Sequence, residues 1–435
     1  MSSWFADYAL LPDGLARDVR FDVIAGRLRS VTADSNADDA ERLPGVVVPG
    51  LANCHSHAFH RALRGRTHAA GGTFWTWREQ MYAVAARLDP DRYLDLARAA
   101  FAEMALAGVT TVGEFHYLHH GPGGQPYVDP NAMAEALRHA AADAGVRLTL
   151  LDACYLIGGL DANGPRPLDD TQRRFADLDV DAWAARVGGL AESPGMRVGV
   201  AVHSIRAVPR AALPTIRVAA DGRPLHVHLS EQPAENAASL ACYGATPAAV
   251  LDDAGLLGPR TTAVHATHLT TEDVGLLGST STTCCICPTT ERDLADGIGP
   301  ARALADAGAP LSLGSDQHAV VDLFEDARGL EMHERLTTQR RGRFTPAELL
   351  AAATRHDSLG WPDAGRLAPG ARADLVAVRL DTVRTAGCDP AQVLYAATAA
   401  DVDTVVVDGE PVVRAGRHRL GDVGRLLADA IGALR

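Results

Sequence analysis

The chain has 435 residues, more than the roughly 250 of one (β/α)8 barrel, so we first expect a barrel with added material. With 47% hydrophobic and 22% charged residues it is an ordinary globular protein, and at a net charge of −13 no basic face of the kind that binds nucleic acid stands out. All 41 basic residues are arginine, and the absence of lysine excludes Schiff-base chemistry and a lysine-bridged pair of metal ions.

Sequence features also bear on the cellular compartment. Residues 1–20 lack the basic start and apolar core of a secretory signal, and no apolar run reaches the roughly 18–20 residues that cross a membrane. The seven cysteines have no framework spacing, so we expect reduced thiols in a cytoplasmic protein. Cys284 and Cys287 form a CxxC pair that we interpret as buried thiols on a strand, because no second pair accompanies it.

Both ends of the chain carry short β-strand patterns. These patterns cover residues 4–10, 19–25, 27–31, 367–380 and 402–414. We expect residues 1–47 and 366–420 to be the two halves of one small β-sandwich domain. Residues 421–435 are expected to form a C-terminal helix.

The middle of the chain, residues 48–365, alternates strand and helix patterns, which is typical of a parallel sheet covered by helices. The eight predicted strands are residues 45–49, 110–115, 147–153, 197–202, 224–229, 262–265, 282–287 and 310–314. Helical patterns rich in Ala and Leu, such as residues 94–106 and 132–144, connect them. This order predicts the α/β class and a closed (β/α)8 TIM-type barrel, whose functional site lies at the carboxyl ends of the strands.

Histidine and acidic residues follow several of these strands. His55 and His57 come after the first strand, and residues two apart in extended chain point to the same side and can share a metal ion. His228 ends the fifth strand, and Asp316 follows the flexible Gly-Ser after the eighth. Three imidazole nitrogens and one carboxylate oxygen, with a position left for water, hold a catalytic zinc. These four residues are the predicted metal ligands.

Other polar residues lie beside this set. Glu231 stands three residues past His228, and burying an unpaired carboxylate there is costly unless it acts as an acid or base. His265 follows the sixth strand. His226 is interpreted as a packed histidine, and the irregular cluster in residues 116–120 as part of the pocket wall.

Together these residues resemble the amidohydrolase superfamily, in its mononuclear aminohydrolase branch. The matching stretches are PGLANCHSHAFHRAL, HVHLSEQ, HATHL, GSDQH and LAPGARADLV, spread over nearly the whole chain. Within that branch the chain is most similar to the formimidoylglutamate deiminases of histidine degradation. The stretches that carry this finer resemblance are residues 73–79 (TFWTWRE), 113–117 (GEFHY) and 203–206 (HSIR).

The resemblance implies a role for each matching position. It implies one zinc ion per subunit, held by His55, His57, His228 and Asp316. It implies proton transfer by Glu231, His265 and Asp316, and it implies that the two carboxylates of a glutamate portion are bound by Arg78, Tyr117, His203 and Arg206. His60 stands where the family pattern has Gln, and it is kept among the substrate-binding residues because a neutral imidazole still donates one hydrogen bond.

The chemistry of a dicarboxylate agrees with this implication. Guanidinium groups bind carboxylates through two parallel hydrogen bonds, and Arg78 and Arg206 are expected on the active face. The reaction implied is hydrolysis of N-formimino-L-glutamate to N-formyl-L-glutamate and ammonia. The resemblance also implies a homodimer, and we expect neither a nucleic-acid nor a membrane partner.

Two alternatives stay open. Another aminohydrolase of the same branch, acting on guanine, cytosine or S-adenosylhomocysteine, would have a mostly apolar and aromatic pocket with few inward arginines. A catalytically silent barrel that serves as a binding module is expected to have lost ligands, whereas the full set is present here.

Overall fold

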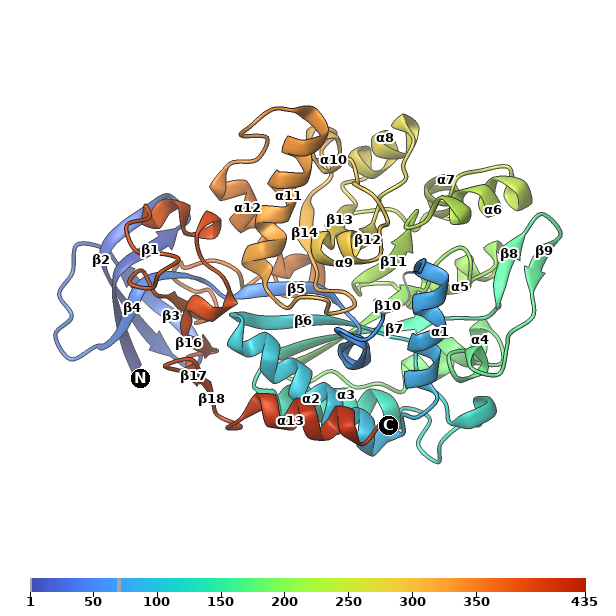
Figure 1. The fold of residues 1–435 in the computed structure, drawn as a ribbon, viewed down its shortest axis with the longest axis horizontal. Helices are drawn as coiled ribbons and strands as arrows, with labels where there is room; N and C mark the ends of the chain where they lie inside the picture. The colour runs from blue at the N-terminus through green and yellow to red at the C-terminus, as the bar shows by residue number, and fades with distance from the viewer. Residues whose placement is uncertain (1, 69–71) are drawn as a thin grey trace.

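Eight parallel strands form the central sheet of the computed structural model, which describes residues 2–68 and 72–435. In chain order they are β5 (Leu51–Ser56), β6 (Val109–His116), β7 (Arg147–Cys154), β10 (Met196–Val202), β11 (Leu225–Leu229), β12 (Thr261–His265), β13 (Thr283–Ile286) and β14 (Leu311–Leu313). Each strand pairs with the next one in this order. A parallel bridge between Ser56 and Asp316 then joins the two ends, so the predicted barrel is confirmed (Figure 1).

Helices cover the outside of this barrel (Figure 1). They are α1 (Phe74–Ala85), α2 (Pro90–Leu106), α3 (Ala132–Ala144), α4 (Val180–Gly188), α5 (Leu213–Ala219), α6 (Pro233–Tyr243), α7 (Pro247–Asp253), α8 (Thr271–Ser279), α9 (Pro288–Asp293), α10 (Ala301–Asp306), α11 (Leu323–Thr338) and α12 (Pro346–Ala353). A short hairpin, β8 (Gly159–Asp161) and β9 (Gly164–Arg166), lies outside the barrel sheet. No helix of the described residues is both long and apolar enough to span a membrane.

Local sequence explains where these helices begin and which face they bury. In α2, the Asp89 side chain accepts a hydrogen bond of 2.9 Å from the backbone N–H of Arg92, and Pro90 occupies the first helical turn. Buried residues such as Leu96, Ala100 and Met104 recur at intervals of four, which places them on one face against the barrel.

One predicted barrel strand is wrong. Residues 45–49 belong to β4 (Glu41–Pro49), which pairs with strands of the terminal sheet, and the first barrel strand is β5. Only Gly50 separates the two strands, and a Cβ there would lie 2.3 Å from the Thr110 hydroxyl oxygen. Because residues 46–49 and the whole of β5 are buried strand, the sequence pattern does not show that the chain passes from one sheet into the other at this glycine.

The two ends of the chain form one eight-stranded sheet, in the order β18-β17-β16-β15-β4-β1-β2-β3. Its strands are β1 (Ser2–Leu11), β2 (Gly14–Ile24), β3 (Arg27–Thr32), β4, β15 (Leu375–Val378), β16 (Val402–Val407), β17 (Glu410–Arg414) and β18 (Arg417–His418). The expected pairing of the two ends is therefore present, with Val47 opposite Ala377. The domain limits at 47/48 and 365/366 stay a prediction.

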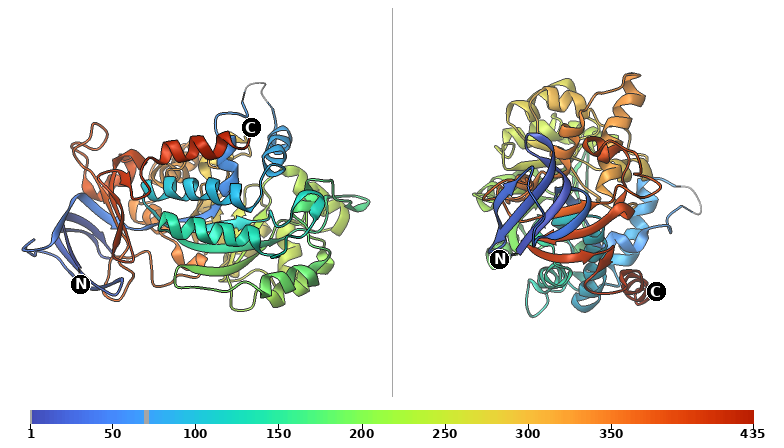
Figure 2. Two further views of the ribbon diagram at one scale, coloured as in Figure 1. Left: turned by 90° about the horizontal axis from the view of Figure 1, so that it is seen from below. Right: turned by 90° about the vertical axis from the view of Figure 1, so that its left-hand side faces the viewer.

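Alternation of side chains along these strands attaches the terminal sheet to the barrel. Val47 packs into the apolar core of the terminal sheet, whereas Val46 and Val48 pack into the core of the barrel. The helix α13 (Val423–Gly432) returns along α2 (Figure 2). The terminal sheet lies beside the amino ends of the barrel strands, away from the β8–β9 hairpin (Figure 1).

A buried ion pair also joins the two parts. Arg147, the first residue of β7, donates hydrogen bonds to both carboxylate oxygens of Asp374, and a further one of 3.1 Å to Asp408. Burial alone would raise the pKa of Asp374, but the Arg147 guanidinium holds this pKa below its ordinary value.

Arg147→Met is expected to lower the free energy of unfolding by about 3–5 kcal/mol, because it leaves Asp374 buried without its cation. Urea denaturation followed by circular dichroism measures the change. Arg42→Met is the matched control, since Arg42 and Asp7 form an exposed pair 3.4 Å apart that contributes at most about 1 kcal/mol. Equal effects of the two substitutions would contradict this assignment.

Candidate functional site

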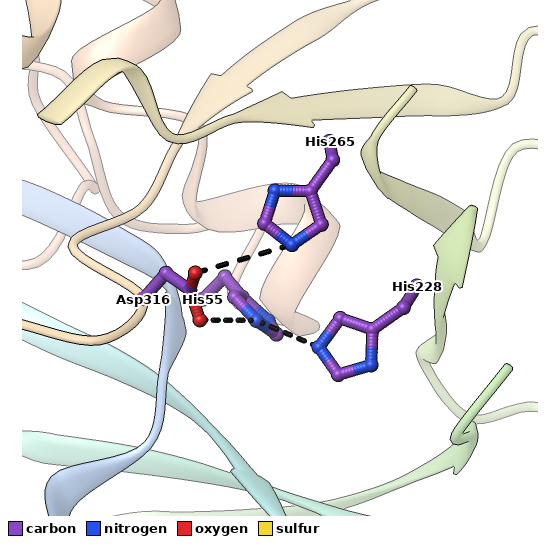
Figure 3. A group of neighbouring side chains, drawn as sticks. All are labelled: His55, His228, His265 and Asp316. Carbon is purple, nitrogen blue, oxygen red and sulfur yellow. Dashed lines mark hydrogen bonds and ion pairs between the residues drawn. The ribbon is translucent and has the colours of Figure 1, made fainter. Parts of the chain in front are cut away.

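Four predicted side chains meet where the barrel closes. His55 and His57 come from the end of β5, His228 from β11, and Asp316 from the segment after β14 (Figure 3 shows all but His57). The Nε2 atoms of His55 and His57 each lie 3.3 Å from Oδ1 of Asp316. Nε2 of His228 lies 3.1 Å from Nε2 of His55 and 3.3 Å from Nε2 of His57. Tetrahedral ligands about 2.0–2.1 Å from a zinc ion are separated by about 3.3 Å, so the spacing fits one ion.

The other ring nitrogens determine how these imidazoles point their lone pairs. Nδ1 of His57 lies 2.9 Å from the carbonyl oxygen of Phe115, and Nδ1 of His228 lies 2.8 Å from that of His203. Because a carbonyl only accepts, both Nδ1 atoms carry the hydrogen, and the two Nε2 atoms direct lone pairs at each other. That arrangement is repulsive without a cation between them. These donors therefore fit a divalent metal ion.

Burial keeps these imidazoles in the form that binds metals. It lowers the pKa of His55 to about 3 and that of His57 to about 4. Both rings are therefore neutral near pH 7, and a neutral imidazole keeps a lone pair on one ring nitrogen for a metal ion. The carboxylate of Asp316 is held in the charged form, because its contacts with the neighbouring histidines, His55 foremost, lower its pKa more than burial raises it.

His265 and Glu231 lie beside the proposed ligands. Nε2 of His265 is 3.9 Å from Oδ2 of Asp316 and 3.8 Å from Oε1 of Glu231, while its Nδ1 is 3.5 Å from Oε1 of Glu291. Burial alone would lower the pKa of His265, but the three carboxylates, Glu231 foremost, raise it to about 10. His265 is thus farther from Asp316 than His55 and His57 are, although its ring also lies close enough to His55, His228 and Asp316 to form a candidate metal-binding group with them (Figure 3).

The backbone at the strand ends takes an unusual conformation. Five residues have positive φ although they are not glycine. They lie just after β11, at or after the end of β12, and after β14. They are Ser230 (50°), His265 (70°), Ala266 (50°), Asp316 (42°) and His318 (60°). Such conformations cost on the order of 1–3 kcal/mol each and cluster at functional sites. Here they turn the chain at the positions from which side chains enter the site.

A glycine lets the last strand approach the first. A Cβ at Gly314 would lie 2.7 Å from Cβ of His55 and 3.0 Å from Sγ of Cys287. Any larger residue would separate the segment that carries Asp316 from the strand that carries His55. The Gly314-Ser315 lead-in therefore serves close packing.

A cavity opens onto these residues. Besides His57, His228, Glu231, His265 and Asp316, its lining includes all five residues predicted to bind substrate: His60, Arg78, Tyr117, His203 and Arg206. Aromatic side chains, among them Trp75 and Tyr155, form much of the rest. His60 lies on the 3-10 helix η1 (Ala58–Leu63), and its Nε2 is 2.8 Å from the Tyr117 hydroxyl.

The two predicted arginines differ in their surroundings. Arg206 donates a hydrogen bond of 2.9 Å to Glu231, and its Nε lies 3.6 Å from a carboxylate oxygen of Glu235. Arg78 lies over the rings of Trp75 and Tyr82, at 4.7 and 5.4 Å from their centroids. In the part of the chain that the structure describes, Arg78 forms no ion pair with a carboxylate.

Sequence reasoning missed two carboxylates near this site. Glu235, in the first turn of α6, is buried, and burial raises its pKa to about 7. Glu291 accepts a hydrogen bond of 2.8 Å from the backbone N–H of Cys287 and faces His265. The spacing of four residues between Glu231 and Glu235 was a visible signal, because it puts both side chains near the start of one helix. No comparable signal marked Glu291.

The histidines in residues 116–120 were misplaced. None of them lines the cavity; they are buried in a separate hydrogen-bonded network. Nε2 of His119 lies 2.9 Å from the carbonyl oxygen of Ala153, and Nε2 of His120 lies 3.1 Å from Asp177. Strand alternation explains the error, since His116 points outward against Tyr93 of α2.

The remaining predictions about polar residues agree with the structure. His226 is buried outside the cavity lining, with Nε2 3.3 Å from the carbonyl oxygen of Ser358. Cys284 and Cys287 are buried free thiols at the strand β13. Both results follow from their places in apolar runs.

Comparison with known proteins gives the family. The model named "Amidohydrolase family" matches residues 46–412, and the one named "Formimidoylglutamate deiminase HutF, N-terminal domain" matches residues 1–45. The chain belongs to the amidohydrolase family.

Individual relatives agree with this assignment. The chain is 37% identical to a formimidoylglutamate deiminase of Pseudomonas aeruginosa over 96% of each chain. It is 33% identical to an 8-oxoguanine deaminase of the same organism, over 88% of this chain and 85% of that one. The structure of an adenosine deaminase from Xanthomonas campestris with bound zinc superposes with a TM-score of 0.84 at 26% identity, covering 99% of this chain and 97% of that one.

Asp316→Asn is expected to reduce the metal content of the purified protein from about one equivalent per chain to a small fraction, because it removes the anionic ligand. Elemental analysis after dialysis measures this. Glu231→Gln is the matched control and should retain the metal, because Glu231 is not among the four predicted ligands. A wild-type protein that is metal-free and indifferent to EDTA would contradict the assignment.

Proposed function

We propose that this protein is a zinc-dependent hydrolase that converts N-formimino-L-glutamate into N-formyl-L-glutamate and ammonia in histidine degradation. The observation that carries the proposal is a cavity that combines convergent histidine and aspartate donors with inward-facing arginines. The 37% identity to a formimidoylglutamate deiminase over 96% of each chain supports the same substrate.

We propose one zinc ion per chain, held by His55, His57, His228 and Asp316. Imidazole nitrogens with one carboxylate oxygen suit zinc, and a related adenosine deaminase has zinc bound. When bound, zinc supplies Lewis acidity that lowers the pKa of water and makes a nucleophile available near neutral pH.

Three side chains would hold the water and move the protons. The carboxylate of Asp316 is placed to take the proton from the attacking water, and the protonated ring of His265, 3.9 Å from that carboxylate, would hold the water by a hydrogen bond. Glu231 faces the same cavity and would deliver a proton to the departing nitrogen. Water oxygen bonds to the formimino carbon, the bond from that carbon to its terminal nitrogen breaks, and ammonia leaves. The carboxylates also offset the positive charge that the formimino group carries.

The remaining predicted residues would orient the substrate. Arg206 has five N–H donors, so it can bind a substrate carboxylate while it still donates to Glu231. Arg78 is held by aromatic faces with its guanidinium free to form a bidentate pair. His203, Tyr117 and His60 line the same cavity and can donate hydrogen bonds to the carboxylates.

A second candidate function is deamination of a purine ring. The 33% identity to an 8-oxoguanine deaminase and the aromatic lining of the cavity favour it. The inward arginines argue against this second function, because a neutral ring substrate has no carboxylate for them to bind. A catalytically silent binding module has less support, since the whole donor set is present.

Assembly and location are part of the proposal. We propose a homodimer, as the family resemblance implies, acting in the cytoplasm on a small dicarboxylate. The free, mostly buried cysteines fit a reducing compartment.

Release of ammonia from N-formimino-L-glutamate is the direct test. The wild-type protein is expected to deiminate it with a kcat/KM at least about 100-fold higher than for guanine, 8-oxoguanine, cytosine or S-adenosylhomocysteine, because only this substrate brings two carboxylates to the arginines. Coupled assay of ammonia with the five compounds side by side measures the ratio. A preference for any of the ring compounds would overturn the substrate assignment.

Glu231→Gln is expected to lower kcat by about 10²–10⁴-fold while the metal content stays near one equivalent, because the amide cannot donate and accept the proton that the carboxyl group transfers. Steady-state kinetics and elemental analysis on the same sample separate the two effects. An unchanged kcat would exclude the proton-transfer role.

A further inference from the structure

The β8–β9 hairpin contributes a third arginine to the cavity. Gly158, Gly159, Leu160 and Arg166 all line it, although none of them was predicted as a site residue from sequence. Leu160 is buried, whereas Arg166 is exposed at the end of β9. The hairpin thus adds an apolar side chain to the wall and a cation at the cavity mouth.

The charges around the cavity are unequally paired. Arg206 already has Glu231 and Glu235 as partners, at 2.9 and 3.6 Å. Neither Arg78 nor Arg166 forms an ion pair with any carboxylate of the described residues. A ligand with two carboxylates therefore meets two guanidinium groups that have no competing anion.

A hydrogen-bonded network attaches the base of the hairpin to the aromatic wall that Arg78 contacts. Nε2 of Gln172, in the 3-10 helix η3 (Gln172–Arg174), lies 3.1 Å from the carbonyl oxygen of Gly158 and 3.2 Å from the hydroxyl of Tyr82. The guanidinium of Arg78 lies over the ring of Tyr82, 5.4 Å from the ring centroid. The hairpin base and the Arg78 side chain are therefore attached to the same aromatic wall.

The hairpin backbone is built to accommodate the Arg166 side chain. The backbone N–H of Gly158 donates a hydrogen bond of 2.9 Å to the carbonyl oxygen of Arg166. A Cβ at Gly159 would lie 2.6 Å from Nη2 of Arg166, so the guanidinium rests on a surface that a glycine leaves open. Since Gly159 also lines the cavity, this contact keeps the Arg166 side chain at the cavity edge.

We propose that Arg166 is a substrate-binding, specificity-determining residue that, together with Arg78, binds the carboxylate nearest the cavity mouth. The inference rests on the proposed function and deepens it. Arg206 then holds the inner carboxylate and keeps its contact with Glu231. Selectivity for a dicarboxylate over a monocarboxylate with the same formimino group depends on the outer pair of guanidinium groups.

The test compares Arg166→Gln with the wild-type protein on N-formimino-L-glutamate and on N-formiminoglycine, which has the same reacting group and one carboxylate. Loss of the guanidinium is expected to raise KM for the dicarboxylate about tenfold or more, with kcat changed less than about twofold. Kinetic constants for N-formiminoglycine should change less than about twofold. Arg166→Lys keeps the positive charge but lacks the paired N–H donors of a guanidinium, so it should give an intermediate KM.

Arg173→Gln is the matched control. Arg173 lies seven residues further along the same segment, is 56% exposed, and pairs with Asp170 at 3.7 Å outside the cavity lining. Its kinetic constants should equal those of the wild-type protein. An active wild-type protein whose Arg166→Gln variant keeps its preference for the dicarboxylate would overturn this inference alone. A wild-type protein that does not deiminate N-formimino-L-glutamate would overturn the proposed function, and this inference with it.

Discussion

The rest of the structure depends on one constraint, which is that the nitrogen lone pairs of His57 and His228 point toward the same position. His57 and His228 each donate their Nδ1 hydrogen to a backbone carbonyl, so their Nε2 atoms, 3.3 Å apart, have no hydrogen to share. The carbonyls belong to neighbouring barrel segments, Phe115 on β6 and His203 after β10. The barrel backbone therefore fixes the ring orientation of the donors before any ion binds, as preorganised metal sites require.

Closure of the barrel depends on the same residues. The backbone N–H of Asp316 donates to the carbonyl oxygen of His55 at 3.0 Å, and that of His57 donates to the carbonyl oxygen of Asp316 at 3.1 Å. The segments that hold these candidate metal ligands thus also join the first strand to the last. At the other end of the barrel, Arg147 and Asp374 join it to the terminal sheet. Within this closed barrel, Asp316 and His265 hold positive φ at the strand ends, where such backbone strain persists only when the surrounding structure fixes it.

Much of the fold and the site could be predicted because their signals are local. Strand and helix periodicity gave seven of the eight barrel strands close to their observed bounds, and the positions of His55, His228 and Asp316 after strands indicated a shared site. The errors come from information that periodicity lacks. Residues 45–49 form a buried strand whichever sheet they join. The sequence likewise does not specify whether a histidine such as His116 points into the barrel or away from it.

The sequence by itself determined the α/β class, the donor types and the absence of lysine, because these depend on composition and on spacing within single segments. Only the tertiary structure decided which partners those groups meet. It brings Glu235 to Arg206, Glu291 to His265, and Arg166 to the same cavity as Arg78. Contacts of this kind join side chains from separate elements, whose distances are set by barrel closure and helix packing and not by their separation along the chain.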